Sequence, residues 1–167
     1  MLSAIVYHSL TGSCKRYAEL LSARLHIPCH ELGKGYVRSD GKVLYVGWVR
    51  AGKVVGYPVA AKFLNVAAVA AVGMSPVTPG SEAAGRRANR IPDDVAYFPL
   101  QGGFHLNKLS KGKQAVMRLI NRGIARKLRA KGSLSPQEQA TYRMAVTGDG
   151  EPAEWDVSAI LDWCRNN

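Results

Sequence analysis

The sequence predicts an α/β fold in which a doubly wound, five-stranded parallel sheet carries helices on both faces. Short apolar runs of strand character, such as AIVY and VLYVG, alternate with stretches whose apolar residues recur at helical spacing. Of the 167 residues, 47% are hydrophobic and 21% are charged, which is ordinary for a chain that buries one core. We therefore expect a single domain that spans residues 1–167.

The first half of the chain supplies three of the expected strands, at residues 3–7, 27–32 and 43–47. A helix is expected at 14–25, where apolar residues recur every three or four positions. A second helix is expected at 58–65, because Pro58 fits the first turn of a helix. Glycines and an Asp-Gly pair predict loops at 33–42 and 50–58.

The second half supplies the other two strands, at residues 66–74 and 95–100. The small apolar residues of 66–74 are typical of a central strand that is covered on both faces. Helices are expected at 81–89, at 110–130, from Ser135 onward with Pro136 in its first turn, and at 153–165.

Three loops are expected at the carboxyl edge of this sheet, where doubly wound folds bind their ligands: residues 9–14, 48–57 and 100–108. The first loop, SLTGSC, offers hydroxyls and backbone N–H groups before a helix, a combination that binds phosphate. The sequence lacks the Walker A pattern and the GxGxxG fingerprint. It also lacks an arginine six residues after Cys14, as a phosphatase loop would need, and acidic residues after the first strand, as a response regulator would need.

The stretch SLTGSC resembles the phosphate loop of flavodoxins, [ST]-x-T-G-x-T, at Ser9, Thr11 and Gly12, and departs from it at Cys14. The resemblance implies a flavodoxin-like domain that binds FMN, with Trp48 stacked on the ring. The cofactor-binding residues that it implies are Ser9, Thr11, Gly12, Ser13, Cys14, Trp48, Gly52, Gly102, Gly103 and Phe104. The alternatives are a Ser/Thr/Gly turn that caps an ordinary helix, and a Trp48 that only ends the core of its strand.

The motif order from VGWVRAGK through YFPLQGGF to MRLINRGIARK resembles the menaquinone-dependent protoporphyrinogen oxidase branch of the flavodoxin-like proteins. This resemblance implies an FMN-dependent oxidoreductase with an anionic or membrane-associated acceptor, and porphyrinogen oxidation as one reaction to test. An electron-transfer flavodoxin without its own substrate, and a basic binding module that has lost flavin, remain alternatives. No general base stands out, since His8 and His105 are interpreted as polar loop residues.

The net charge of +11 is concentrated in a basic helical stretch at about residues 108–131. Nine lysines and arginines lie there and no acidic residue occurs from 95 to 137, whereas the rest of the chain has 14 basic and 12 acidic residues. The stretch is either a solvated helix face or a docking surface for anionic lipid, an acidic redox partner protein or a quinone- or tetrapyrrole-type molecule. Nucleic acid ranks last, because no aromatic residues interleave the basic ones.

The cysteines and the first residues of the chain predict where in the cell the protein is located. Cys14, Cys29 and Cys164 are odd in number and far apart, so they predict neither a disulfide framework nor a metal site. No targeting pattern opens the chain, and no apolar run approaches the roughly 18 residues that a spanning helix needs. We expect a cytoplasmic protein, with peripheral contact at the inner face of the membrane through 108–131 as a variant of that location.

Overall fold

The computed structural model describes residues 1–34, 40–74, 77–102, 111–134, 138, 139, 142, 145, 146 and 157–167. Its strands are β1 (Leu2–His8), β2 (Cys29–Glu31), β3 (Lys42–Arg50), β4 (Lys53–Val54), β5 (Asn65–Gly73) and β6 (Ala96–Gln101). Its labelled helices are α1 (Ser13–Leu25), α2 (Tyr57–Phe63), α3 (Ser81–Asn89), α4 (Lys111–Arg129) and α6 (Ser158–Asn166). The helix expected from Ser135 onward lies largely outside the described residues. The helix expected at 153–165 corresponds to α6, and positions 153–156 also lie outside the described residues.

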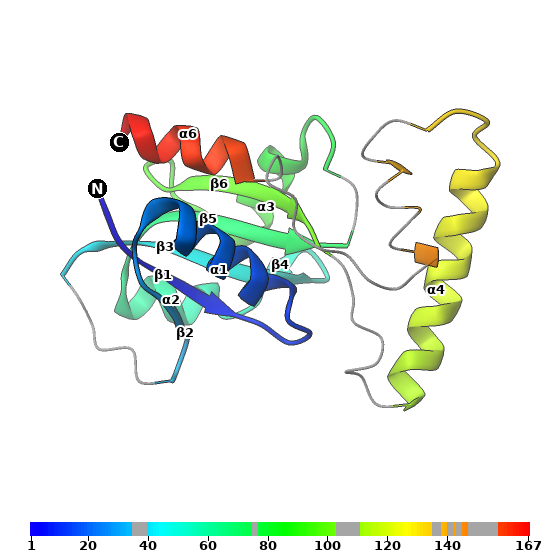
Figure 1. The fold of residues 1–167 in the computed structure, drawn as a ribbon, viewed down its shortest axis with the longest axis horizontal. Coiled ribbons are helices and arrows are strands. Elements are labelled where there is room, and N and C mark those ends of the chain that lie inside the picture. The colour runs from blue at the N-terminus through cyan, green and yellow to red at the C-terminus, as the bar shows by residue number, and fades with distance from the viewer. Residues whose placement is uncertain are drawn as a thin grey trace.

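Five of the strands form a parallel sheet in the order β2-β1-β3-β5-β6, shown in Figure 1. The chain begins in β1, which is second in this order, and continues to β2 at the edge of the sheet. It then crosses over β1 and forms β3, β5 and β6 on the other side. This is the flavodoxin-like doubly wound order, with a switch point between β1 and β3. The predicted fold class is therefore confirmed.

The expected loop at 50–58 is wrong in part, because it contains a sixth strand. β4 pairs antiparallel with the end of β3, with Val49 opposite Val54 and Arg50 opposite Lys53. The two residues between them, Ala51 and Gly52, have φ of 48° and 78°, as a type I′ hairpin turn requires. The buried Val54 side chain then adds to the core.

The second helix is also shorter than expected. α2 ends at Phe63, and Leu64 has extended backbone with φ −126° and ψ 152°. Asn65, expected as the last helical residue, is the first residue of β5 and pairs with Lys42 of β3. Sheet pairing therefore overrides the helical pattern at this boundary.

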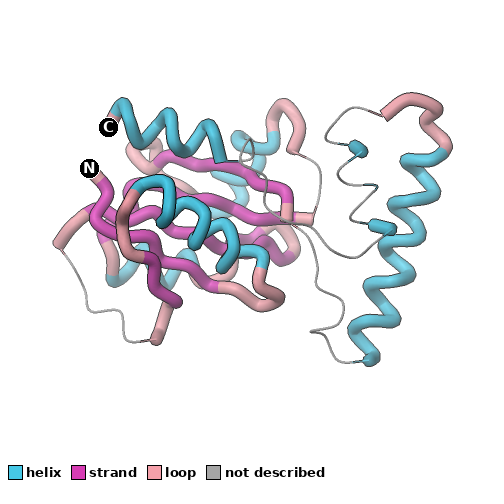
Figure 2. The backbone as a smooth tube through the Cα atoms, viewed as in Figure 1, coloured by secondary structure: helices cyan, strands magenta, loops and turns pink. Residues whose placement is uncertain are grey.

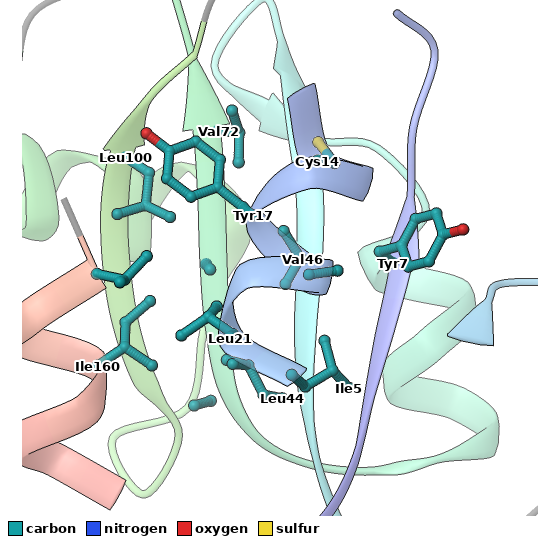
Figure 3. Packing of buried hydrophobic residues seen from close by; sticks show 14 residues of the cluster. Ile5, Tyr7, Cys14, Tyr17, Leu21, Leu44, Val46, Val72, Leu100 and Ile160 are labelled. Atoms are coloured by element: carbon teal, nitrogen blue, oxygen red, sulfur yellow. The ribbon is translucent and has the colours of Figure 1, made fainter. Parts of the chain in front are cut away.

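Helices cover both faces of the sheet, as Figure 2 shows by element type. On one face α1 and α6 pack over a core that includes Ile5, Leu44 and Val46. Figure 3 shows the Tyr17 ring of α1 directed toward β6, beside Leu100. On the other face the core holds Tyr57 and Ala60 of α2 and the residues Ile91 and Val95 that follow α3. Strands buried on both faces explain the nearly continuous apolar runs of the sequence.

Helix α4 stands apart from the sheet, on the side toward which the parallel strands point in Figure 1. Its bounds agree with the expected helix at 110–130, except that position 110 lies outside the described residues. No helix within the described ranges is long and apolar enough to cross a membrane.

Candidate functional site

A pocket of about 390 Å³, open to solvent, lies at the carboxyl edge of the sheet beside the switch point between β1 and β3. Open α/β sheets bind ligands at this position. Its lining residues are Ser9, Leu10, Thr11, Ser13, Cys14, Trp48, Val49, Val72, Gly73, Met74 and Gly102. None of these side chains carries a formal charge, so a ligand there is recognised by hydrogen bonds and apolar contact.

The loop between β1 and α1 forms the polar end of this pocket. Gly12 adopts a left-handed conformation with φ 103°, and its N–H donates to the Ser9 hydroxyl over 3.0 Å. This bond closes the loop and brings the start of α1 to the pocket. No acidic residue occupies the first turn of α1, so the partial positive charge of the helix N-terminus is not neutralised there.

Thr11 is a buried polar residue of this loop. Its side chain is only 9% exposed and lines the pocket. Within the described part of the chain its hydroxyl has no hydrogen-bond partner, which is uncommon for a buried polar group. Ser13, 6% exposed, lies beside it at the start of the helix. A ligand with acceptor oxygens would satisfy the Thr11 hydroxyl.

Cys14 stands where the flavodoxin pattern has threonine, and its side chain is buried. Burial raises the pKa of this thiol to about 12. The group is therefore a neutral thiol at physiological pH and adds no negative charge next to the loop.

The opposite end of the pocket is apolar and is built by the ends of β3 and β5. Trp48 and Val49 come from β3, Val72 comes from the end of β5, and Met74 directly follows that strand. The Trp48 indole N–H donates to Nδ1 of His8 over 3.1 Å. A half-buried indole held in this way gives the pocket a flat aromatic wall.

Gly102 closes the pocket beyond the end of β6. Its N–H donates to the carbonyl oxygen of Gly73 over 2.7 Å, which joins the ends of β5 and β6. A Cβ atom at this position would lie 2.4 Å from Cγ1 of Val72, closer than two carbon atoms can approach. Glycine therefore lets the backbone reach the wall of the pocket.

The structure brings most of the predicted binding residues together at this pocket. Those that line it are Ser9, Thr11, Ser13, Cys14, Trp48 and Gly102, and Gly12 shapes the loop between them. Gly52 does not line the pocket, since it lies in the β3–β4 turn, where its carbonyl oxygen accepts from the Asn89 amide over 3.0 Å. Gly103 and Phe104, like His105, lie outside the described residues.

Sequence reasoning missed the contribution of β5. Val72, Gly73 and Met74 line the pocket, although 66–74 was predicted only as a central strand. The signal was present, because the carboxyl end of a central parallel strand must reach the same edge as its neighbours. Leu10 and Val49 also line the pocket, and each is adjacent in the sequence to a predicted binding residue.

No family model matches the chain, and no curated protein matches it. Among solved structures, the chain is similar to the crystal structure of a flavodoxin, WrbA-like protein from Agrobacterium tumefaciens. The TM-score is 0.33 and the sequence identity 12%, over 87% of this chain and 95% of that chain. We assign the fold from the strand order and not from this similarity.

Proposed function

We propose that the chain is a flavin-binding oxidoreductase that holds FMN non-covalently in the carboxyl-edge pocket. The observation that carries this proposal is one pocket with two chemically different ends. The first is an uncharged loop at a helix N-terminus, whose buried Thr11 hydroxyl has no hydrogen-bond partner among the described residues. The second is an apolar wall with the Trp48 indole. FMN has the same two halves, a phosphate and a flat aromatic ring, so the residues present fit it.

The loop end would take the phosphate. The hydroxyls of Thr11 and Ser13 would donate to its oxygens, together with N–H groups of the first turn of α1, which have no partner within the helix. Ser9 would act indirectly, because its hydroxyl oxygen already accepts the Gly12 N–H and so fixes the loop.

The apolar end would take the ring. The Trp48 indole would stack on it, while Val49, Val72 and Met74 exclude water and the backbone at Gly102 approaches closely. A bound flavin supplies the electron chemistry, and the chain supplies position and local electrostatics. No acid or base of the pocket lining is needed for electron transfer.

For the acceptor we propose an anionic molecule or surface, recognised by the basic helix α4. Its exposed cations are Lys111, Arg118, Arg122, Arg126, Lys127 and Arg129. Leu119 is 71% exposed among them, and no acidic residue occurs from 95 to 137. A tetrapyrrole with carboxylate groups, an acidic redox protein and an anionic membrane surface all fit this charge, whereas a quinone acceptor is neutral and would rely on apolar contact. Porphyrinogen oxidation is the enzymatic reaction to assay first. An electron-transfer flavodoxin would share the site and turn over no small substrate.

The test of flavin binding uses the purified protein. We expect flavin absorption bands that stay with the protein through gel filtration, and saturable quenching of FMN fluorescence on titration. The double variant Thr11→Ala/Ser13→Ala should weaken FMN binding at least tenfold, since each lost hydrogen bond to a charged group contributes about 1.5–3 kcal/mol.

Helix α3 offers a matched control for this variant. It also begins after a left-handed glycine, Gly80, and its first residue Ser81 is bonded to Thr78 rather than to the pocket. Thr78→Ala/Ser81→Ala should therefore leave FMN binding unchanged. A wild-type protein that is colourless and releases added FMN would overturn the proposal and favour the binding module without flavin.

A further inference from the structure

The side chains of His8 and Trp48 meet at the rim of the carboxyl-edge pocket. His8 was expected in the first loop but is the last residue of β1, because it pairs with Gly47 of β3, and it directly precedes the loop that forms the polar end. Trp48 lies near the end of β3, one position beyond Gly47, which pairs with His8 in the sheet. The Trp48 Nε1–H donates to His8 Nδ1 over 3.1 Å, so one bond links the polar loop to the aromatic wall.

This bond fixes the protonation state of His8. An indole nitrogen can only donate, so Nδ1 of His8 must be the acceptor and carry no proton. The imidazole is then the neutral form with its proton on Nε2. A protonated imidazole has two N–H donors and no acceptor, and it cannot receive the indole N–H. Protonation of His8 therefore breaks the bond that holds Trp48.

Several titratable and charged side chains lie on the elements around His8. On β2, His30 pairs with Val6, which lies on the same face of β1 as His8, and Glu31 is paired with Lys34 over 3.1 Å. On β3, the Tyr45 hydroxyl donates to the Val55 carbonyl oxygen over 2.7 Å, and Arg50 is exposed.

The other elements near this end of β1 carry Lys53 on β4, Tyr57 on α2 and Cys14 on α1. Lys53 bonds the Ala88 carbonyl oxygen, and Tyr57 and Cys14 are buried. Within the described residues, the hydrogen-bond partner of His8 is Trp48.

We propose that His8 is a positioning residue that sets the plane of the Trp48 indole, and that protonation of His8 releases the indole from the flavin ring. The inference rests on the proposed function, because it concerns the ring that the pocket would hold. Histidine is the side chain whose charge commonly changes between pH 5 and 8. Stacking of the indole on the ring is then complete where His8 is neutral and is lost as the pH falls and His8 gains a proton.

The first experiment needs no flavin. In protein labelled with ¹⁵N-tryptophan, the indole N–H resonance that is absent from Trp48→Phe belongs to Trp48. We expect this resonance to shift with pH in a single titration and to exchange with solvent severalfold faster on the acid side. A Trp48 resonance that does not respond to pH would overturn the proposal.

Two variants of His8 distinguish its role as hydrogen-bond acceptor from its change of protonation state. His8→Asn offers an amide oxygen close to the position of Nδ1, so Trp48 should stay protected and no longer respond to pH. His8→Leu offers no acceptor, so fast exchange is expected at every pH. The control is His26→Asn, since His26 has φ 54°, which asparagine tolerates, and it should leave the titration intact. A titration that persists in His8→Asn contradicts the assignment to His8.

The second experiment uses the FMN-loaded protein. A stacked indole quenches flavin fluorescence, so the emission of bound FMN should rise as the pH falls in the wild type and stay low in His8→Asn. If FMN binds but His8→Leu quenches it as fully as the wild type, the positioning role is wrong and the proposed function stands. If no FMN binds, the proposed function fails and the positioning of the ring fails with it, while the resonance data still decide the link between His8 and Trp48.

Discussion

The Tyr17 hydroxyl donates a hydrogen bond of 2.5 Å to the main-chain carbonyl oxygen of Gln101, and this bond joins two walls of the pocket. Tyr17 lies one turn into α1, the helix that begins at the polar loop, and its side chain is buried. Gln101 is the last residue of β6 and directly precedes Gly102. The orientation of α1 is thereby tied to the strand end that closes the other side of the pocket.

Tyr17→Phe should lower the free energy of unfolding by about 1 kcal/mol, the usual net contribution of a buried hydrogen bond. The ring keeps its packing against the core, so the loss reports on the hydroxyl. Urea denaturation followed by circular dichroism measures it. Tyr97→Phe is the control, because the buried Tyr97 hydroxyl has no hydrogen bond within the described residues. Equal losses in the two variants would contradict the role given to the Tyr17 bond.

Gly102→Ala should lower the free energy of unfolding by about 1–3 kcal/mol, because the new methyl group would overlap Val72. Either Val72 or the end of β6 must move, and both border the pocket, so FMN binding should weaken as well. Gly123→Ala in α4 is the matched control, since a methyl group there meets nothing within 4 Å. That change should raise helix stability by up to about 1 kcal/mol. If Gly102→Ala were as stable as the wild type, the close approach at the pocket wall would be wrong.

Cys14 should make the protein lose stability in alkali. Its folded-state pKa is raised to about 12 from the ordinary 9.0, so the folded chain keeps a proton that the unfolded chain releases. The stabilisation is complete below about pH 9 and is lost as the pH rises through 9 toward 12, by at most about 1.4 kcal/mol per pH unit.

The difference between the wild type and Cys14→Ser isolates this contribution. Tyr97, whose pKa is raised by burial alone, contributes equally in both proteins, whereas Cys14 adds to the raised pKa of Tyr45, so that part of the Tyr45 contribution is lost together with the thiol. Unfolding in urea at pH 8 and at pH 10.5 should show a steeper loss for the wild type. Parallel pH profiles in the two proteins would show that the Cys14 thiol does not titrate in this range.

Charge reversal on α4 should weaken association with an anionic partner and leave the fold unchanged. In Arg118→Glu/Arg122→Glu/Arg126→Glu, all three side chains are exposed, so unfolding should be unaffected. Binding to vesicles that contain anionic lipid, or turnover of a carboxylated acceptor, should fall steeply and depend on salt. Arg50→Glu/Lys62→Glu/Arg87→Glu carries the same change in net charge on exposed residues away from α4. Equal losses in both variants would show that the net charge of the protein, and not the position of the charges on α4, determines binding.

The parts of the site that were predictable from sequence are those encoded within a few consecutive residues. The strand, the SLTGSC loop and the start of α1 follow one another, so their polar and apolar pattern alone placed Ser9, Thr11 and Ser13 at a pocket. The bond between His8 and Trp48 joins residues 40 positions apart, and only the sheet register brings them together. The same holds for Tyr17 and Gln101, 84 positions apart.

The β3–β4 hairpin shows why Gly52 was misplaced. A type I′ turn usually has Asn-Gly or Asp-Gly at its two central positions, and this chain has Ala51-Gly52, so the sequence lacked the turn signal. The turn is held instead by Asn89 of α3, whose amide donates to the Gly52 carbonyl oxygen and whose oxygen accepts the Val54 N–H. That support comes from a helix 37 positions away, which no local pattern reveals.

Ala51→Asn should therefore raise the free energy of unfolding by about 1 kcal/mol. Ala51 has φ 48°, which costs an alanine side chain energy, whereas asparagine tolerates this conformation and forms the preferred Asn-Gly turn. Ala51→Val is the opposite control, because a β-branched side chain is strained at positive φ and should lower stability. Position 51 is exposed, so the two variants differ in backbone preference rather than in burial. Urea midpoints should rank Asn above Ala and Ala above Val at constant m-value, and any other order would contradict the type I′ turn between β3 and β4.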